Sequence, residues 1–118
     1  MSVEAMWTVE FVGLPGQEAN FGAGVLVLET QRAFGGDSYM YYVGSYKVNG
    51  SQISIEVAVG YHNPAGESVF GPQFRSFTLQ GIGTVSSDHT VIEWDASMQG
   101  HPQNKLKARF RRLAELPG

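Results

Sequence analysis

The side chains that could carry out catalysis or bind a metal are few and widely separated in this sequence. The three histidines, His62, His89 and His101, lie among turn-forming residues and share no spacing typical of a metal site. Cysteine is absent, which excludes thiolate catalysis and Cys-based zinc sites. We therefore expect neither a metal nor a cofactor.

Two acidic arrangements resemble parts of hydrolase sites. Residues 86–89 read Ser-Ser-Asp-His, but neighbours in one tight turn cannot align as nucleophile, base and orienting acid. Glu93 and Asp95 share one face of a predicted strand, whereas a retaining glycosidase holds two carboxyls about 5 Å apart across a substrate groove. A self-bonded turn and a solvated strand face are the simpler interpretations. The sequence therefore predicts a protein that is not an enzyme.

The elements that must position these residues are strands. The 118 residues fit one domain, residues 1–118, and glycine, β-branched and aromatic residues are prominent. Apolar and polar residues alternate with period two, and glycine-rich or proline-rich turns separate the runs. The pattern predicts eight strands, over residues 5–13, 21–29, 32–36, 38–48, 51–61, 73–85, 90–98 and 104–113.

Short connections between these strands make successive strands antiparallel neighbours. An open sheet of eight would expose two edges, which closure into a barrel removes. We therefore expect an all-β fold, an eight-stranded antiparallel up-and-down barrel, with a β-sandwich as the alternative. Asn49-Gly50 lies between two apolar runs and predicts a hairpin with a type I′ turn.

Charge and hydropathy restrict the class of partner. The formal net charge is −3, and the basic residues of the last strand (Lys105, Lys107, Arg109 and Arg111) share one face without interleaved aromatics. A solvated face, an acidic protein partner and nucleic acid are the three interpretations, and we expect no direct nucleic-acid binding.

No apolar run approaches the roughly 20 residues of a membrane helix, and no apolar leader opens the chain. We therefore expect a cytoplasmic protein that does not bind membranes.

Residues 24–29 are apolar on both faces of their predicted strand. Val25 and Val27 point one way, and Leu26 and Leu28 point the other. A barrel interior buries only one of these faces, so the other face would be an exposed patch. A homodimer would cover this patch, and packing under a loop is the alternative.

The tyrosines of residues 38–48 suit either a cavity lining or an interface, because each has an apolar ring and a polar tip. Tyr42 and Tyr46 share one face. We expect them to line the barrel interior with five other residues, giving the set Trp7, Phe11, Tyr42, Tyr46, Ile55, Val57 and Phe110. This interior could hold a small apolar ligand or lipid, and an ordinary packed core is the alternative.

A spaced motif joins this strand to the preceding ones. Its residues are Gly22, Gly24, Gly35, Gly36, Asp37, Tyr42 and Gly44. The motif resembles the GrlR-like negative regulators of type III secretion, well over residues 6–61 and loosely beyond. The resemblance implies a lipocalin-like eight-stranded barrel that is usually dimeric, and the best-known member of the family binds a helix-turn-helix transcriptional activator and keeps it off DNA. This chain departs from the family at residues 48–51, Val-Asn-Gly-Ser, where the best-known member carries an acidic run.

The Gly-Gly-Asp segment predicts a bend between two strands. We expect Gly35 or Gly36 to have a positive φ, and Asp37 to accept hydrogen bonds from loop amides. Its place at a barrel end would also make it a ligand mouth.

Together the patterns favour a non-enzymatic binding protein, a negative transcriptional regulator that acts on a protein partner. A small-molecule or lipid carrier is the alternative.

Overall fold

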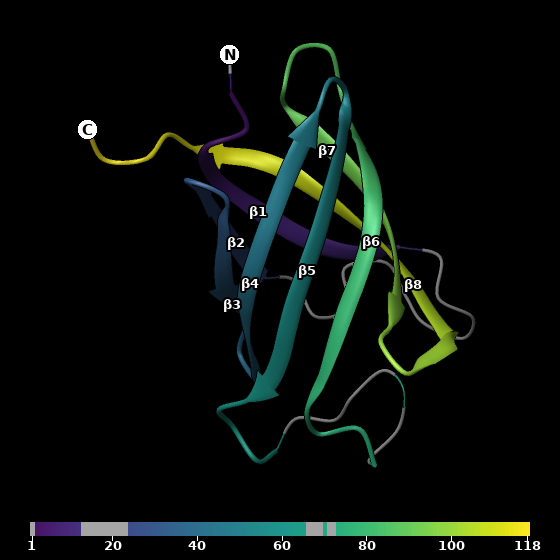
Figure 1. Ribbon diagram of the computed structural model, residues 1–118. Coiled ribbons are helices and arrows are strands. Elements are labelled where there is room, and N and C mark those ends of the chain that lie inside the picture. Colours follow the sequence, from purple (N-terminus) through teal and green to yellow (C-terminus); the bar gives the residue numbers. More distant parts are fainter. Residues whose placement is uncertain (1, 13–23, 66–69, 71–72) are drawn as a thin grey trace.

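The chain folds into eight strands and no helix over the residues that the structure describes. The computed structural model describes residues 2–12, 24–65, 70 and 73–118 (Figure 1). The strands are β1 Ala5–Val12, β2 Gly24–Glu29, β3 Arg32–Gly36, β4 Met40–Asn49, β5 Gln52–Tyr61, β6 Phe77–Val85, β7 Val91–Met98 and β8 His101–Ala114. None of these residues belongs to a helix long and apolar enough to cross a membrane.

The sheet closes on itself as an up-and-down barrel. Each strand pairs antiparallel with the next, and β1 also pairs with β8 through residues such as Val9 and Phe110. This closure confirms the predicted eight-stranded antiparallel barrel and excludes the β-sandwich. In Figure 1, β8 crosses behind β4 and β5 and meets β1.

Period-two alternation decides which side chains fill the barrel. In β5, Ile53, Ile55, Val57 and Val59 point inward and are buried, while the residues between them are exposed or small. Leu106, Ala108 and Phe110 do the same in β8. One continuous core cluster results, and burying it provides the main free energy of folding.

The two ends of the barrel differ. The terminal end holds both described ends of the chain and the short β2–β3, β4–β5 and β6–β7 turns, and the loop end holds the β3–β4 and β7–β8 turns. At the terminal end, the Arg112 guanidinium donates hydrogen bonds to the carbonyl oxygens of Ser2 (2.8 Å) and His89 (3.2 Å). Because it also lies over the ring of Trp7, Arg112 joins three segments across this end.

The β4–β5 hairpin forms one residue later than predicted. Asn49 pairs with Gln52, so the turn residues are Gly50 and Ser51. Gly50 alone has a positive φ (64°), which is typical of a type II′ turn and not of the predicted type I′ turn. The turn with two consecutive left-handed residues is instead β2–β3, where Thr30 (φ 51°) and Gln31 (φ 65°) occupy it without a glycine.

Candidate functional site

Inward side chains fill most of the barrel interior. A cavity of about 30 Å³ remains near its middle, and a second of about 20 Å³ lies beneath Phe70 and Phe77 at the loop end. One water needs roughly 10–15 Å³ by the same measure, whereas small-molecule pockets have about 300–1,000 Å³. Each cavity therefore has room for a water or two, and neither has room for a lipid.

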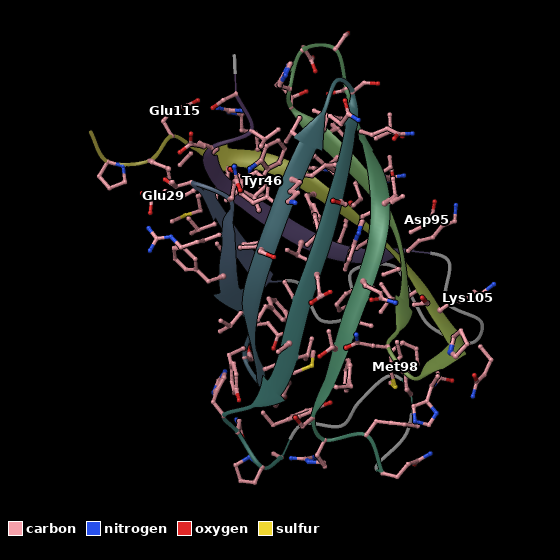
Figure 2. The ribbon with its side chains drawn as sticks, in the orientation of Figure 1. Glu29, Tyr46, Asp95, Met98, Lys105 and Glu115 are labelled. Carbon is pink, nitrogen blue, oxygen red and sulfur yellow. The ribbon has the colours of Figure 1, made fainter. Side chains whose placement is uncertain are left out.

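Most of the predicted lining set surrounds the larger cavity. The five that line it are Phe11, Tyr42, Ile55, Val57 and Phe110. Trp7 and Tyr46 are also buried, but they do not line it. Figure 2 shows Tyr46 near the terminal end, away from Met98 at the loop end. Burial raises the pKa of the Tyr46 phenol.

Trp94 is a lining residue that the sequence analysis did not single out. Its ring lies 5.9 Å from that of Phe110, and its side chain is buried. Among the described residues nothing accepts a hydrogen bond from Nε1 of Trp94, whereas Nε1 of Trp7 donates to Val3 O at 2.9 Å. A buried donor without an acceptor costs roughly 1–3 kcal/mol. The alternation of β7 predicts that Trp94 points inward, but no local signal predicts a missing acceptor.

Asp37 organises the loop end of β3 and β4. Its Oδ1 accepts hydrogen bonds from the backbone N–H groups of Tyr39 (2.8 Å) and Met40 (2.7 Å), which confirms the predicted bonds to loop amides. Its Oδ2 accepts a 2.6 Å hydrogen bond from the Tyr42 hydroxyl. Burial, and then the hydrogen bond to Asp37, raise the pKa of Tyr42 well above its ordinary value, so the phenol stays a donor.

The expected backbone role of Gly35 and Gly36 is wrong. Neither residue has a positive φ, because both lie in regular β3. A Cβ at Gly35 would overlap the carbonyl oxygen of Val25. A Cβ at Gly36 would lie 2.6 Å from the carbonyl oxygen of Met40. The two glycines are therefore needed because adjacent strands approach closely, and not because the chain turns there.

The other motif glycines extend this close packing. A Cβ at Gly24 would lie 2.7 Å from Gly36 O, and a Cβ at Gly44 would overlap the carbonyl oxygen of Glu56. The register places Gly35 between Leu26 and Tyr42 across β2, β3 and β4. The structure thus brings the motif together on three adjacent strands, except for Gly22, which lies outside the described residues.

The histidines do not converge. His62 and His101 lie at the loop end, and His89 lies at the opposite end. Within the described ranges, no group of three or more His, Cys, Asp or Glu side chains could hold a metal ion. His62 Nε2 lies 2.8 Å from the backbone oxygen of Asp37, so this imidazole is bound to the β3–β4 turn.

The Ser-Ser-Asp-His segment forms a self-bonded turn. The Asp88 carboxylate accepts hydrogen bonds from the Thr90 and Ser86 hydroxyls, each at 2.7 Å. These bonds, with that from Thr90 first, lower the pKa of the exposed Asp88 carboxyl. Both hydroxyls donate to Oδ1 of Asp88, so this carboxylate is hydrogen-bonded within its own turn, as expected for a structural turn.

The basic face of β8 meets acidic side chains on both neighbouring strands. Arg109 bonds Glu93 at 2.8 Å and lies 3.9 Å from Glu10, and Arg111 bonds Glu10 at 3.4 Å. Lys107 lies 3.3 Å from Asp95. Figure 2 shows Asp95 and Lys105 on the side of the barrel away from Glu29. Glu93 and Asp95 do share a face, and each forms an ion pair there with a basic side chain of β8. Three of the four basic residues, Lys107, Arg109 and Arg111, have acidic neighbours.

The two faces of β2 separate as the sequence predicts. Leu26 and Leu28 are buried inside the barrel, while Val25 and Val27 lie on its outer surface and are half-buried. The register continues this outer surface onto β3, where Val27 pairs with Phe34. Phe34 is 39% exposed, so an apolar surface lies outside the barrel.

Comparison with family models finds no match for this chain, and comparison with curated proteins finds none either. The class of protein defined by the structure is a closed eight-stranded β-barrel with a filled interior. The resemblance to GrlR-like regulators rests on the motif residues and remains a proposal.

Proposed function

We propose that this chain is a non-enzymatic, cytoplasmic binding protein that negatively regulates transcription by binding a regulatory protein, in the manner of the GrlR-like family. The observation that carries the proposal is the filled interior. Within the part of the barrel lined by the described residues, the cavities of about 30 and 20 Å³ have no room for a lipid or a drug-sized ligand, which supports recognition at the outer surface. The same observation disfavours the carrier alternative.

The electrostatics favour a protein over DNA as the direct partner. Arg109, Arg111 and Lys107 lie in ion pairs with Glu10, Glu93 and Asp95, so their charges are compensated on the surface. Nucleic-acid binding requires basic side chains that can replace counterions at phosphates. A regulator that removes an activator from DNA, without contacting DNA itself, agrees with this surface.

The contact with the activator differs from that of the best-known family member. The β4–β5 hairpin carries Val48, Asn49, Gly50 and Ser51, and none of these is acidic. The hairpin therefore lacks the negative charge that would select a basic DNA-binding surface. The activator must meet another part of the barrel.

The test first asks whether a helix-turn-helix activator is encoded beside the gene for this chain. It then combines that activator, its promoter DNA and this chain in a gel-shift assay. Adding the chain at 1–10 times the activator concentration is expected to release the DNA, while the chain alone shifts no DNA. The release should be matched by a complex of chain and activator in sedimentation. A direct shift of DNA by the chain, or an activator that stays bound throughout, overturns the proposal.

A further inference from the structure

A hollow of about 270 Å³ lies at the terminal end, apart from the cavities of the barrel interior. Four segments that are far apart in the chain line this terminal hollow: the residues before β1, the β2–β3 turn, β4 and the β6–β7 turn. Figure 2 shows Tyr46 of β4 at this end. Val3 and Tyr46 are buried, whereas the other lining residues are half-buried or exposed, namely Ser2, Glu4, Gln31, Val48 and His89. A concave site that mixes apolar and polar side chains is typical of small-ligand binding.

Arg112 holds the walls of the terminal hollow in place. Its guanidinium donates hydrogen bonds to the carbonyl oxygens of Ser2 (2.8 Å), His89 (3.2 Å) and Glu4 (3.4 Å), and all three of these residues line the hollow. The Glu115 carboxylate pairs with the same guanidinium at 3.0 Å and balances its charge. One side chain thus fixes the residues before β1 against the β6–β7 turn, as a pre-organised site requires.

Backbone strain gathers around the same hollow. The described non-glycine residues with a positive φ are Thr30 (51°), Gln31 (65°) and His89 (60°). Gln31 and His89 line the hollow, and the N–H of Thr30 donates to Oε1 of Glu4 at 3.3 Å. A left-handed backbone is costly for residues with a Cβ, and such residues cluster at functional sites. A ligand that contacts the side chains of Gln31 and His89 would explain why glycine does not occupy these positions.

The polar side chains of the hollow offer hydrogen-bond acceptors. Nδ1 of His89 lies 3.3 Å from the carbonyl oxygen of Ser87. Because a carbonyl oxygen only accepts, Nδ1 carries the proton, and Nε2 of the neutral ring is an acceptor. The Glu4 carboxylate and the amide oxygen of Gln31 are acceptors as well. An alkylammonium group has three donors and no acceptor, so it matches this set.

Charge favours the same class of ligand. Glu4 is the acidic residue of the lining, and it belongs to no ion pair with another described residue. Glu29 nearby is paired with Arg32 at 3.1 Å. Burial chiefly raises the pKa of the Tyr46 phenol, and the carboxylates of Glu4 and Glu29 raise it further, so their negative charge is felt in the hollow. A cation is therefore attracted there and an anion is repelled.

We propose that the terminal hollow binds the ammonium group of a short alkylamine, either a free amine or the lysine side chain of a protein. Glu4, Gln31 and Nε2 of His89 accept its three hydrogen bonds, and the alkyl chain packs against Val3 and Val48. The proposal goes beyond the regulatory function and does not rest on it, because its test uses this chain alone. Failure of either proposal leaves the other standing.

The test titrates n-butylammonium chloride, which has the same chain and charge as a lysine side chain, into ¹⁵N-labelled protein at neutral pH and constant ionic strength. Amide signals of residues 2–4, 30–31 and 89 are expected to shift, with a dissociation constant of about 1–10 mM for so small a ligand. Sodium butyrate should shift none of them. The proposal is overturned if n-butylammonium leaves these signals unmoved, or if butyrate moves them equally.

Glu4→Gln should weaken binding at least tenfold, because it removes the charge but keeps an oxygen for the N–H of Thr30. Glu56→Gln is the matched control, since it removes the same charge from an exposed position of β5 outside the hollow and should bind like wild type. Replacing Thr30-Gln31 by Asn-Gly should weaken binding severalfold, because the Gln31 side chain is lost. Wild-type affinity in the Glu4→Gln chain or in the Asn-Gly chain overturns the proposal.

A capped lysine, N-acetyl-lysine methylamide, separates the two sources of the ammonium group. Binding at least as tight as that of n-butylammonium assigns the hollow to a lysine side chain of a protein. Weaker binding assigns it to a free amine, because the peptide groups then do not fit.

Discussion

The hydroxyl of Tyr42 donates a 2.6 Å hydrogen bond to Oδ2 of Asp37, five residues earlier in the chain. The bond joins an inward side chain of β4 to the turn that begins the strand, and Oδ1 of the same carboxylate holds two backbone amides. One carboxylate thus fixes the β3–β4 turn to the barrel core.

Replacing Tyr42 by Phe should destabilise the fold by about 1–2 kcal/mol, because one oxygen of Asp37 loses its donor in a partly buried site. The free energy of unfolding, measured by urea titration followed by tryptophan fluorescence, checks this. Tyr39→Phe is the control, since Tyr39 is 45% exposed and should change stability by less than about 0.5 kcal/mol. Equal effects at the two positions would refute the role of the bond.

The raised pKa of Tyr42 also predicts a dependence on alkaline pH. Because the folded state holds this proton more tightly than the unfolded state, the contribution to stability is fully present below the unfolded pKa of about 10. It is lost as the pH rises above that value. The difference in unfolding free energy between wild type and Tyr42→Phe should therefore shrink between pH 9 and pH 11. A constant difference across this range would contradict the assignment.

Gly35→Ala should destabilise the fold by about 2–3 kcal/mol, because its Cβ would overlap the carbonyl oxygen of Val25 in the adjacent strand. Two comparisons separate a clash from backbone strain. Gly50→Ala has open space but a φ of 64°, and should cost about 1 kcal/mol. Gly118→Ala has neither problem and should be neutral. Thermal or chemical unfolding that ranks Gly50→Ala above Gly35→Ala would show that close approach is not the reason for Gly35.

Replacing Thr30-Gln31 by Asn-Gly should stabilise the protein by about 1 kcal/mol or more. Both residues have left-handed backbones, which cost L-residues with a Cβ roughly 1–2 kcal/mol each and which Asn-Gly adopts readily. The N–H of residue 30 can still donate to Glu4. Ser51→Gly, at a turn position without a positive φ, is the control and should bring no gain. An unchanged melting temperature for Asn-Gly would count against the strained turn.

The two tryptophans should respond differently to replacement by Phe. Trp7→Phe loses the hydrogen bond to Val3 O and should cost about 1–2 kcal/mol more than Trp94→Phe, which removes a buried donor that no described residue accepts. Both side chains are buried, so the loss of ring volume is similar in the two variants. Urea titration of both variants measures the difference. Equal costs would indicate that Nε1 of Trp94 has a partner in the folded protein.

The local sequence pattern determined the class of fold and the direction of most side chains. Alternation in residues 51–61 and 104–113 predicts Ile55, Val57 and Phe110 as inward, and all three are buried. It likewise separates Leu26 and Leu28 from Val25 and Val27. These predictions succeed because a strand turns successive side chains to opposite faces, so the direction follows from residue spacing alone.

Only the tertiary structure decided which strands approach closely and which side chains meet. Position 35 is glycine because the carbonyl oxygen of Val25 on β2 lies where a Cβ would be. The charge of Arg109 is neutralised by Glu93 and Glu10, which lie on two different strands. The turn at Gly50-Ser51 depends on a one-residue choice of register between β4 and β5. The small volume of the interior depends on how side chains from strands all around the barrel fill it together. Such contacts join residues far apart in the chain, and spacing along one strand contains no information about its partner's register or the volume left between them.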